Sequence, residues 1–391
     1  MPASTNGGKS KGIRDKIFCK AIRFVGKEDF VLISCDAFLF DKDFVDSSRE
    51  TAAHNLGVKP EQVALIATHA VSAPAVLLSR KETANSDYAS YVHQKVQEAV
   101  EGLASPQKAS LYFKGARAPG LALNAIYPEK KADDSVFAVH LKTSTNRISL
   151  INFSCHPFAS GLENYLISGD YPSYIYKEYE GAQGEEALFL NGASGEIYPS
   201  SLEYPERTDS FSRSEKIGKI LAESTFPDGD QVDSVVVSES VKLDLPLEKF
   251  YGGIENARAG PESFRGSGAL DRAENLEEEW LKKLNENRTG FVQSEVQVLA
   301  LSNQVTIVGF QGELFSSLGE TVQLGSPFAN TLIANNSNGW LGHIPDRKIY
   351  ESKDELRAYR GAILPLNKES GKMIVKAMLK ALSSVSEKMQ R

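Results

Sequence analysis

Cysteine is scarce in this chain, and long apolar runs are missing. The 391 residues include only Cys19, Cys35 and Cys155, an odd and widely spaced set that excludes a scaffold of several disulfides and a Cys-X-X-Cys metal knuckle. No apolar run reaches the roughly 18 residues of a membrane-spanning helix, so we expect no membrane span. The first residues, MPASTNGGKSKG, lack the apolar segment of a signal peptide. We therefore expect a cytoplasmic protein, or a secreted or periplasmic one if a leader has been removed.

An excess of basic residues is also missing. Lys and Arg total 44 against 51 Asp and Glu, which gives a net charge of -7. Broad electrostatic binding to nucleic acid or to an anionic membrane is therefore not expected. The length, and a hydrophobic share of 41%, are those of a soluble globular protein that can bury a core without disulfide or metal support. The oligomeric state is left open by these numbers.

The motifs of common hydrolase nucleophiles are absent as well. The sequence contains no Gly-X-Ser-X-Gly, no Ser-X-X-Lys, no His-Glu-X-X-His and no phosphate-binding P-loop. Cys155 stands beside His156, but a cysteine in a strand is usually buried and inert. A hydrolytic function would thus need another source of nucleophile.

What the chain does contain is an alternation of two hydrophobic periods, near two and near 3.6 residues. The predicted strands are residues 30–40, 63–70, 109–117, 135–144, 147–157 and 232–247, a strand running into a Gly-rich turn over 185–199, and two strands around a Ser-Asn turn over 294–310. The predicted helices are residues 45–58, 88–103, 214–223, 271–287 and 370–385. This alternation predicts a mixed α/β (α+β) fold, a single large domain of mixed sheets flanked by helices.

The composition sets the expected boundaries of that domain. Residues 1–12 are rich in Gly, Ser and Lys, and we expect them to form a flexible arm. Residues 13–391 are expected to form the catalytic domain. Within it, residues 249–269 are rich in Gly, Pro and Arg and are expected to be a mobile loop.

Four polar residues follow strand-like runs. His69 ends VALIATH, His156 ends ISLINFSCH, Glu313 ends QVTIVGFQGE and His343 follows NTLIANNSNGWLGH. Because ligands collect beyond the carboxyl ends of strands in α/β sheets, these side chains could converge at one rim. Three imidazoles and a carboxylate suit a divalent ion, with zinc as the leading candidate. Zinc can lower the pKa of a bound water to about 7, so it could supply the nucleophile for amide or ester hydrolysis.

Each of these residues also has a structural interpretation. A histidine at a strand end is most often hydrogen bonded to nearby backbone, and Glu313 could cap the helical segment that follows it. The remaining histidines, His54, His93 and His140, fall inside predicted helices and a strand, and we expect them to be surface or core residues.

The order of the motifs resembles the catalytic domain of the neutral, non-lysosomal ceramidase family and its bacterial relatives. The resemblance runs from about Gly12 to about Leu382. Its segments are GIRDKIFCKAIRF with FVLISCDAF, ATHAVSAP (67–74), INFSCHPFASGLENYLISGDYPSY (151–174), LFLNGASGEIYP (188–199), VGFQGELFSSLG (308–319) and NGWLGHIPD (338–346). Each motif is short, but their shared order makes the resemblance fairly specific.

This resemblance implies a zinc hydrolase that cleaves an N-acyl bond by means of a metal-activated water. It implies His69, His156 and Glu313 as zinc ligands, and it places His343 where the family has a tyrosine ligand. Histidine is a competent zinc ligand, so this replacement keeps a site.

Further residues are expected to support the reaction. The resemblance makes Tyr359, or else Tyr350, the counterpart of a tyrosine that polarises the substrate carbonyl. Asp170 is expected to orient the ligands from behind, with Asp36 and Glu196 as alternatives.

The chain also departs from the family pattern. Val71 replaces the second histidine of the first motif, Tyr198 replaces a serine, and Asn124-Ala125 replaces an Asn-Arg pair. No segment corresponds to the family's C-terminal immunoglobulin-like domain. These changes predict a small-molecule amide substrate other than ceramide, either smaller or more polar. The same centre could instead act on an ester or lactone, and the losses at Val71 and Tyr198 leave open a metal- or ligand-binding protein without catalysis.

Overall fold

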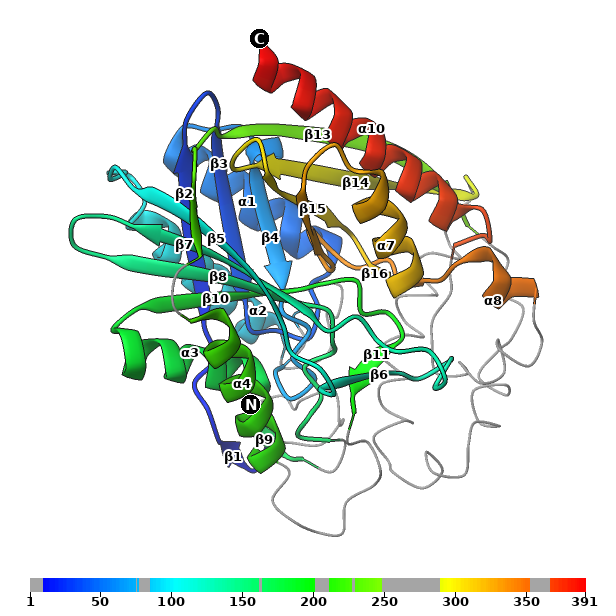
Figure 1. The fold of residues 1–391 in the computed structure, drawn as a ribbon, viewed down its shortest axis with the longest axis horizontal. Helices are drawn as coiled ribbons and strands as arrows, with labels where there is room; N and C mark the ends of the chain where they lie inside the picture. Colours follow the sequence, from blue (N-terminus) through cyan, green and yellow to red (C-terminus); the bar gives the residue numbers. More distant parts are fainter. Residues whose placement is uncertain are drawn as a thin grey trace.

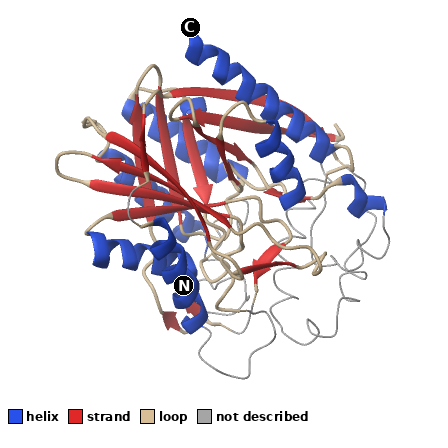
Figure 2. Cartoon of the chain, viewed as in Figure 1, coloured by secondary structure: helices blue, strands red, loops and turns tan. Residues whose placement is uncertain are grey.

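The structure is a computed structural model, and it describes residues 10–74, 76, 85–161, 164–200, 211–226, 229–247, 289–351 and 366–391. Its three larger sheets and their helices form a mixed α/β fold, as the sequence predicts (Figures 1 and 2). The loop expected at 249–269, the helix expected at 271–287 and Tyr359 lie outside the described residues. Among the described residues, no helix is long and apolar enough to cross a membrane.

The first sheet has the strand order β2-β3-β4. Its elements are β2 (Cys19–Val25), β3 (Asp29–Cys35), α1 (Lys42–Leu56), η1 (Pro60–Gln62), β4 (Val63–Ala67) and α2 (Asn85–Glu101). Strands β3 and β4 are parallel because α1 returns the chain between them. The helix α1 begins at Asp41, whose side chain accepts a hydrogen bond from the Phe44 amide, and it ends at Gly57, which adopts a left-handed φ of 68°.

The second sheet has the order β10-β8-β7-β5-β12. Its elements are β5 (Ser110–Arg117), β7 (Ser135–Lys142), β8 (Arg147–Phe153), α3 (Tyr171–Gln183), β10 (Glu186–Asn191), α4 (Phe211–Thr225) and β12 (Asp230–Val232). Helices α3 and α4 lie side by side and bury their apolar faces against β8 and β10 (Figure 1). The sequence analysis did not predict α3.

The third sheet has the order β13-β14-β15-β17. Its elements are β13 (Val237–Pro246), β14 (Phe291–Ala300), β15 (Val305–Phe310), α7 (Ser316–Gly325), β17 (Asn330–Ala334) and α10 (Ser370–Gln390). Helix α10 lies across β13 and β14, and its Ile374, Met378 and Leu382 are fully buried in the shared core (Figure 1).

Short strand pairs connect the segments between these sheets. They are β1 (Gly12–Ile13) with β9 (Leu166–Ile167), β6 (Ala122–Asn124) with β11 (Ile197–Pro199), and β16 (Glu313–Leu314) with β18 (His343–Ile344), and a short helix α8 (Arg347–Glu351) follows β18. Within the arm expected over residues 1–12, the Lys11 amide binds the Tyr165 carbonyl and Gly12 pairs with Leu166.

Polar side chains tie the three sheets together near their strand ends. The Asn152 side-chain nitrogen donates to the carbonyls of Leu190 (3.0 Å) and Ile333 (2.9 Å), and thus joins β8, β10 and β17. The Ser34 hydroxyl donates to the Phe189 carbonyl across β3 and β10. These ties bring the carboxyl ends of strands from all three sheets to one region.

Several predicted strands end earlier than the sequence suggests. The run 63–70 ends at Ala67, the run 147–157 ends at Phe153 and the run 185–199 divides into β10 and β11. In each case the chemically interesting residues stand in the loop after the strand. The physical reason is that the backbone of these residues makes hydrogen bonds with other loops and no longer with the neighbouring strand of the sheet.

A disulfide that the sequence analysis did not predict joins Cys19 to Cys35. These residues face each other on the antiparallel pair β2 and β3, with a Cα–Cα distance of 4.0 Å. Cys155 is free, fully buried, and burial raises the pKa of its thiol well above the usual value. It therefore has the inert character expected of a strand-end cysteine.

Candidate metal centre

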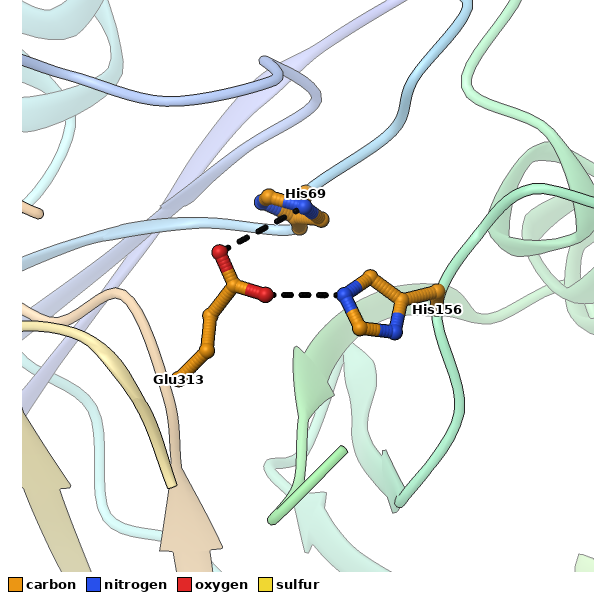
Figure 3. Close-up of side chains that lie close together, drawn as sticks. All are labelled: His69, His156 and Glu313. Atoms are coloured by element: carbon orange, nitrogen blue, oxygen red, sulfur yellow. Dashed lines mark hydrogen bonds and ion pairs between the residues drawn. The ribbon is translucent and has the colours of Figure 1, made fainter. Parts of the chain in front are cut away.

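Three of the four predicted ligands converge. One ligand atom from each of His69, His156 and Glu313 lies within 4.8 Å of the other two, although the residues come from different sheets (Figure 3). Their side chains are 5%, 3% and 0% exposed. Among the described residues, this is the one cluster of His, Cys, Asp or Glu with spacing suitable for a metal ion.

Local backbone geometry places each of these side chains. His69 follows β4 and has a positive φ of 65°, a conformation that costs free energy in a residue other than glycine and is often kept at functional sites. His156 follows β8, and its amide binds the Ile197 carbonyl at 3.0 Å. Glu313 follows β15, and its amide binds the Gly342 carbonyl at 3.0 Å.

The two histidine loops are also joined to each other. The Val71 amide donates to the Pro157 carbonyl at 3.2 Å, so the segment after His69 is tied to the segment after His156. Val71 occupies the position where the resemblance expects a second histidine. Its backbone thus contributes to the site although its side chain supplies no polar group.

The backbone carbonyl of Ile197 determines which nitrogen of His156 is protonated. Its Nδ1 lies 2.9 Å from the Ile197 carbonyl, which can only accept, so Nδ1 carries the proton. The other ring nitrogen, Nε2, faces Oε2 of Glu313, 2.8 Å away; without a proton of its own it is an acceptor. Two acceptors at this distance repel each other unless a proton or a metal ion lies between them. A buried imidazole held by a carbonyl on its other side is a usual arrangement for a metal ligand.

The carboxylate of Glu313 is held on its other oxygen. The indole nitrogen of Trp340 donates to Oε1 at 2.5 Å, and Nε2 of His69 lies 3.6 Å from the same oxygen. Burial by itself raises the pKa of Glu313, but the surrounding histidines, above all His343, outweigh burial and hold that pKa well below its usual range. The carboxyl group is therefore ionised at neutral pH.

His69, the third member of the group, is an uncharged imidazole beside the ionised Glu313. Burial lowers the pKa of His69 to about 3, against the opposing effect of Glu313. Its Nδ1 is buried without a hydrogen-bond partner of normal geometry among the described residues. Two histidines and a carboxylate form the donor set of catalytic zinc sites with three protein ligands, so the residues present fit zinc.

His343, the fourth predicted ligand, adjoins this group but is not part of its compact set. It pairs with Glu313 across β16 and β18, and its Nδ1 lies 3.6 Å from Oε2 of Glu313. The same Nδ1 lies 3.1 Å from the Gly195 carbonyl, which fixes the proton on this nitrogen. Its coordination of a metal stays a prediction.

Asp170 does not reach the three ligands through any described hydrogen bond. Its carboxylate instead accepts hydrogen bonds from the amides of Ala159 (3.1 Å), Ser160 (2.8 Å) and Tyr171 (2.7 Å). It caps α3 and fixes the loop that begins at His156, while burial raises its pKa. Asp170 is thus placed as a positioning residue and not against the reacting atoms.

The two alternative acids have similar positions behind other ligands. Asp36 accepts hydrogen bonds from the Phe18 amide (3.0 Å), the Tyr176 hydroxyl (3.0 Å) and the Thr68 hydroxyl (3.4 Å), next to His69. Burial raises the pKa of Asp36 to about 6. 

Glu196 is the acid behind Glu313 and His343. It accepts hydrogen bonds from the amide of Ser316 at the start of α7 (3.0 Å) and from the side chain of Asn124 (3.2 Å). Burial raises the pKa of Glu196. Each of the three acids therefore holds a backbone segment that leads to a predicted ligand.

Aromatic rings next to the histidines were not predicted to contact them. The ring of Tyr198 stacks on His156 with centroids 4.5 Å apart, and the ring of Phe38 lies 4.5 Å from that of His69. The only sequence signal for Phe38 was its place just after the end of β3. Tyr350, the alternative to Tyr359, instead donates its hydroxyl to the Leu366 carbonyl at 2.9 Å.

Comparison with known proteins identifies the fold. No protein-family model matches the chain, and no curated protein matches it in sequence. Among solved structures, neutral ceramidase from Pseudomonas aeruginosa is similar with a TM-score of 0.71 and 12% identity, covering 99% of this chain and 74% of that chain. A ceramidase complexed with C2 gives the same values. The chain therefore has the fold of neutral ceramidase, which confirms the predicted resemblance at the level of the fold.

Proposed function

We propose that this protein is a zinc-dependent hydrolase that cleaves an amide bond of the N-acyl type. The observation that carries the proposal is the contact between His156 and Glu313. Nε2 of His156 and Oε2 of Glu313 are buried and 2.8 Å apart, so a proton or a metal ion lies between them, and His69 completes a three-residue donor set that suits zinc. The fold shared with neutral ceramidase supports the choice of an amide bond.

The chain's own residues would prepare this centre for catalysis. His69, His156 and Glu313 would hold the metal, and zinc, when bound, would supply an activated water and polarise the substrate carbonyl. Trp340 orients the carboxylate, and the Ile197 carbonyl fixes the tautomer of His156. Near-complete burial of the three ligands excludes bulk water and strengthens the electrostatic effect of the centre.

We propose a substrate other than ceramide. Val71 and Tyr198 stand where the resemblance expects polar residues, and Tyr198 covers a face of the His156 ring. The space beside this ligand is therefore shaped differently from that expected of a ceramide-cleaving site. Tyr359 remains the proposed hydrogen-bond donor to the oxyanion, and His343 the proposed fourth ligand.

The test combines metal analysis with turnover. Purified protein should bind about one equivalent of zinc by elemental analysis and should hydrolyse a member of a panel of N-acyl amides. The variant His69→Ala should lose both properties. The matched control is His54→Ala, because His54 is exposed on α1 and should leave both unchanged. Zinc content below about one-tenth of an equivalent after reconstitution would contradict the proposal.

Matched amide and ester substrates separate the remaining alternatives. The same centre can act on either carbonyl, and an ester has the better leaving group. Turnover of esters or lactones without amides would make the protein an esterase. Full zinc occupancy without turnover of either class would make the site a metal-binding one without catalysis.

A further inference from the structure

Four aromatic rings form a continuous row through the candidate metal centre. The ring of Phe38 lies 4.5 Å from that of His69, His69 lies 4.9 Å from His156, and His156 lies 4.5 Å from Tyr198. The two imidazoles are the inner members of the row, and the two hydrocarbon-rich rings are its ends. Phe38 and Tyr198 therefore flank the two proposed imidazole ligands, one on either side.

The two ends of the row carry the exposed surface of its rings. The three proposed ligands are at most 5% exposed, whereas Phe38 and Tyr198 are partly exposed, as are Val71 and His343. Phe38 and Tyr198 therefore offer aromatic surface next to the proposed ligands.

The geometry of the Tyr198 end favours flat groups. Tyr198 and His156 are nearly parallel, with 9° between their planes, and the ring of Phe158 meets the edge of Tyr198 at 75°. An aromatic face attracts another flat ring through its quadrupole and its large apolar area, and a puckered ring of equal size gains less. The segment carrying Phe38 is itself fixed, because the neighbouring Cys35 carbonyl accepts a hydrogen bond from the Thr68 amide.

We infer that Phe38 and Tyr198 are specificity-determining residues that select substrates with a flat aromatic group next to the scissile carbonyl. This inference rests on the proposed function, since it takes the metal group as the point where the carbonyl binds. It names an aryl amide as the substrate class, in place of the more polar amide expected from the sequence. Both residues act by contact with the substrate and supply no proton.

The test uses binding, so that it does not depend on turnover. Benzohydroxamate and cyclohexanecarbohydroxamate both chelate zinc and carry rings of the same carbon number, one flat and one puckered. The zinc-loaded full-length chain should bind benzohydroxamate about tenfold more tightly, because aromatic stacking on two rings exceeds the gain from area alone. Isothermal titration calorimetry measures both affinities.

Variants assign this preference to the two rings. Tyr198→Leu and Phe38→Leu should each reduce the preference to about threefold or less, while Tyr198→Phe, which keeps the ring, should retain it. Phe113→Leu is the matched control, since Phe113 stacks on Phe137 between β5 and β7 and should leave the preference unchanged. Zinc content is measured for every variant. If either Tyr198→Leu or Phe38→Leu does not fold and bind zinc, the remaining one of the two carries the test.

The outcomes distinguish this inference from the proposed function. Equal binding of the two hydroxamates by the zinc-loaded protein would overturn the inference and leave the metal centre intact. A protein that takes up no zinc would overturn both. An aryl preference without hydrolysis of any amide would support the inference while contradicting the hydrolytic proposal.

Discussion

Nε2 of His156 lies 2.8 Å from Oε2 of Glu313, while Nδ1 of the same ring donates to the Ile197 carbonyl. A neutral ring with its proton on Nδ1 has none on Nε2, so the contact needs either a second proton or a metal ion between Nε2 and Oε2. A metal ion that binds here therefore takes the place of a proton. This property makes the metal requirement of the protein measurable through its stability.

The substitution Glu313→Gln should weaken both the metal-free fold and the binding of zinc. The amide can accept from Trp340 and donate to Nε2 of His156, but it lacks the ionised carboxylate that the lowered pKa of Glu313 shows the fold to favour, so the metal-free variant should have a lower free energy of unfolding at neutral pH. Zinc affinity should fall on the order of 100-fold or more, since even the loss of an outer partner costs 10- to 100-fold.

Thermal denaturation with and without a chelator checks both effects of Glu313→Gln. Zinc at about 100 times its dissociation constant should stabilise the wild-type chain by about 3 kcal/mol, and this gain should vanish in the variant. A variant that is destabilised without metal and still gains from zinc would show that Glu313 is not a ligand.

The loop that begins at His156 should depend on Asp170. Asp170→Ala leaves three buried amides without an acceptor and should cost about 4 kcal/mol of stability, with weaker zinc binding because His156 is released. Asp170→Asn keeps an acceptor oxygen and the shape of the side chain, so it should lie between the alanine variant and the wild type. Urea denaturation and zinc titration measure the two quantities. Unchanged zinc affinity in both variants would restrict Asp170 to a role in folding.

Acid should destabilise the fold through His140, away from the proposed ligands in sequence. Burial, helped by Lys142 and Arg147, lowers the pKa of His140 to about 4. In the unfolded chain this histidine has a pKa of about 6.5, so below that pH it binds a proton that it does not bind in the folded chain. The contribution of His140 to the free energy of unfolding is therefore complete above pH 6.5 and is lost as the pH drops towards 4. The contribution is about 3 kcal/mol over this range.

The variant His140→Gln isolates this effect from that of Asp36. The raised pKa of Asp36, about 6, has the opposite sign, because the folded carboxyl binds a proton more readily than the unfolded one. From pH 7 to pH 4, the free energy of unfolding of the wild type should fall by about 3 kcal/mol more than that of His140→Gln. A constant difference would mean that His140 is not buried as a neutral ring.

The disulfide between Cys19 and Cys35 should stabilise the first sheet. It closes a loop with a sequence separation of 16, and a loop of this length contributes about 3 kcal/mol in the chain-entropy account. Dithiothreitol should lower the free energy of unfolding of oxidised protein by about this amount. The double variant Cys19→Ser, Cys35→Ser should be insensitive to the reductant, and mass spectrometry should find the bond in the oxidised wild type.

The strand ends show how far the sequence alone reaches. Continuous apolar runs predicted the strands β3, β4, β8 and β15, because a strand that is buried on both faces is apolar at nearly every position. The polar residues directly after such runs were then expected at the carboxyl ends of the strands, where α/β sheets bind their ligands. For this reason His69, His156 and Glu313 could be named before their contact was known.

The helix α3 shows where the sequence signal was insufficient. Residues 171–183 contain four tyrosines, Tyr171, Tyr174, Tyr176 and Tyr179, and no simple apolar stripe. Three of these buried tyrosines have hydroxyl partners across the fold: Tyr171 binds the Cys155 carbonyl, Tyr176 binds Asp36 and Tyr179 binds Thr225. A pattern of hydrophobic residues cannot reveal burial that depends on distant hydrogen-bond partners.

The sequence by itself determined the mixed α/β class, the apolar runs that form the central strands and the residue types that suit a metal, because these follow from local periodicity and donor chemistry. Only the tertiary structure decided that three of those residues meet, that the Ile197 carbonyl fixes one imidazole, and that Asp170 lies behind the site. It also decided that Phe38 and Tyr198 flank the ligands. These relationships join residues far apart in the chain, and their distances depend on how the sheets pack, which no local pattern encodes.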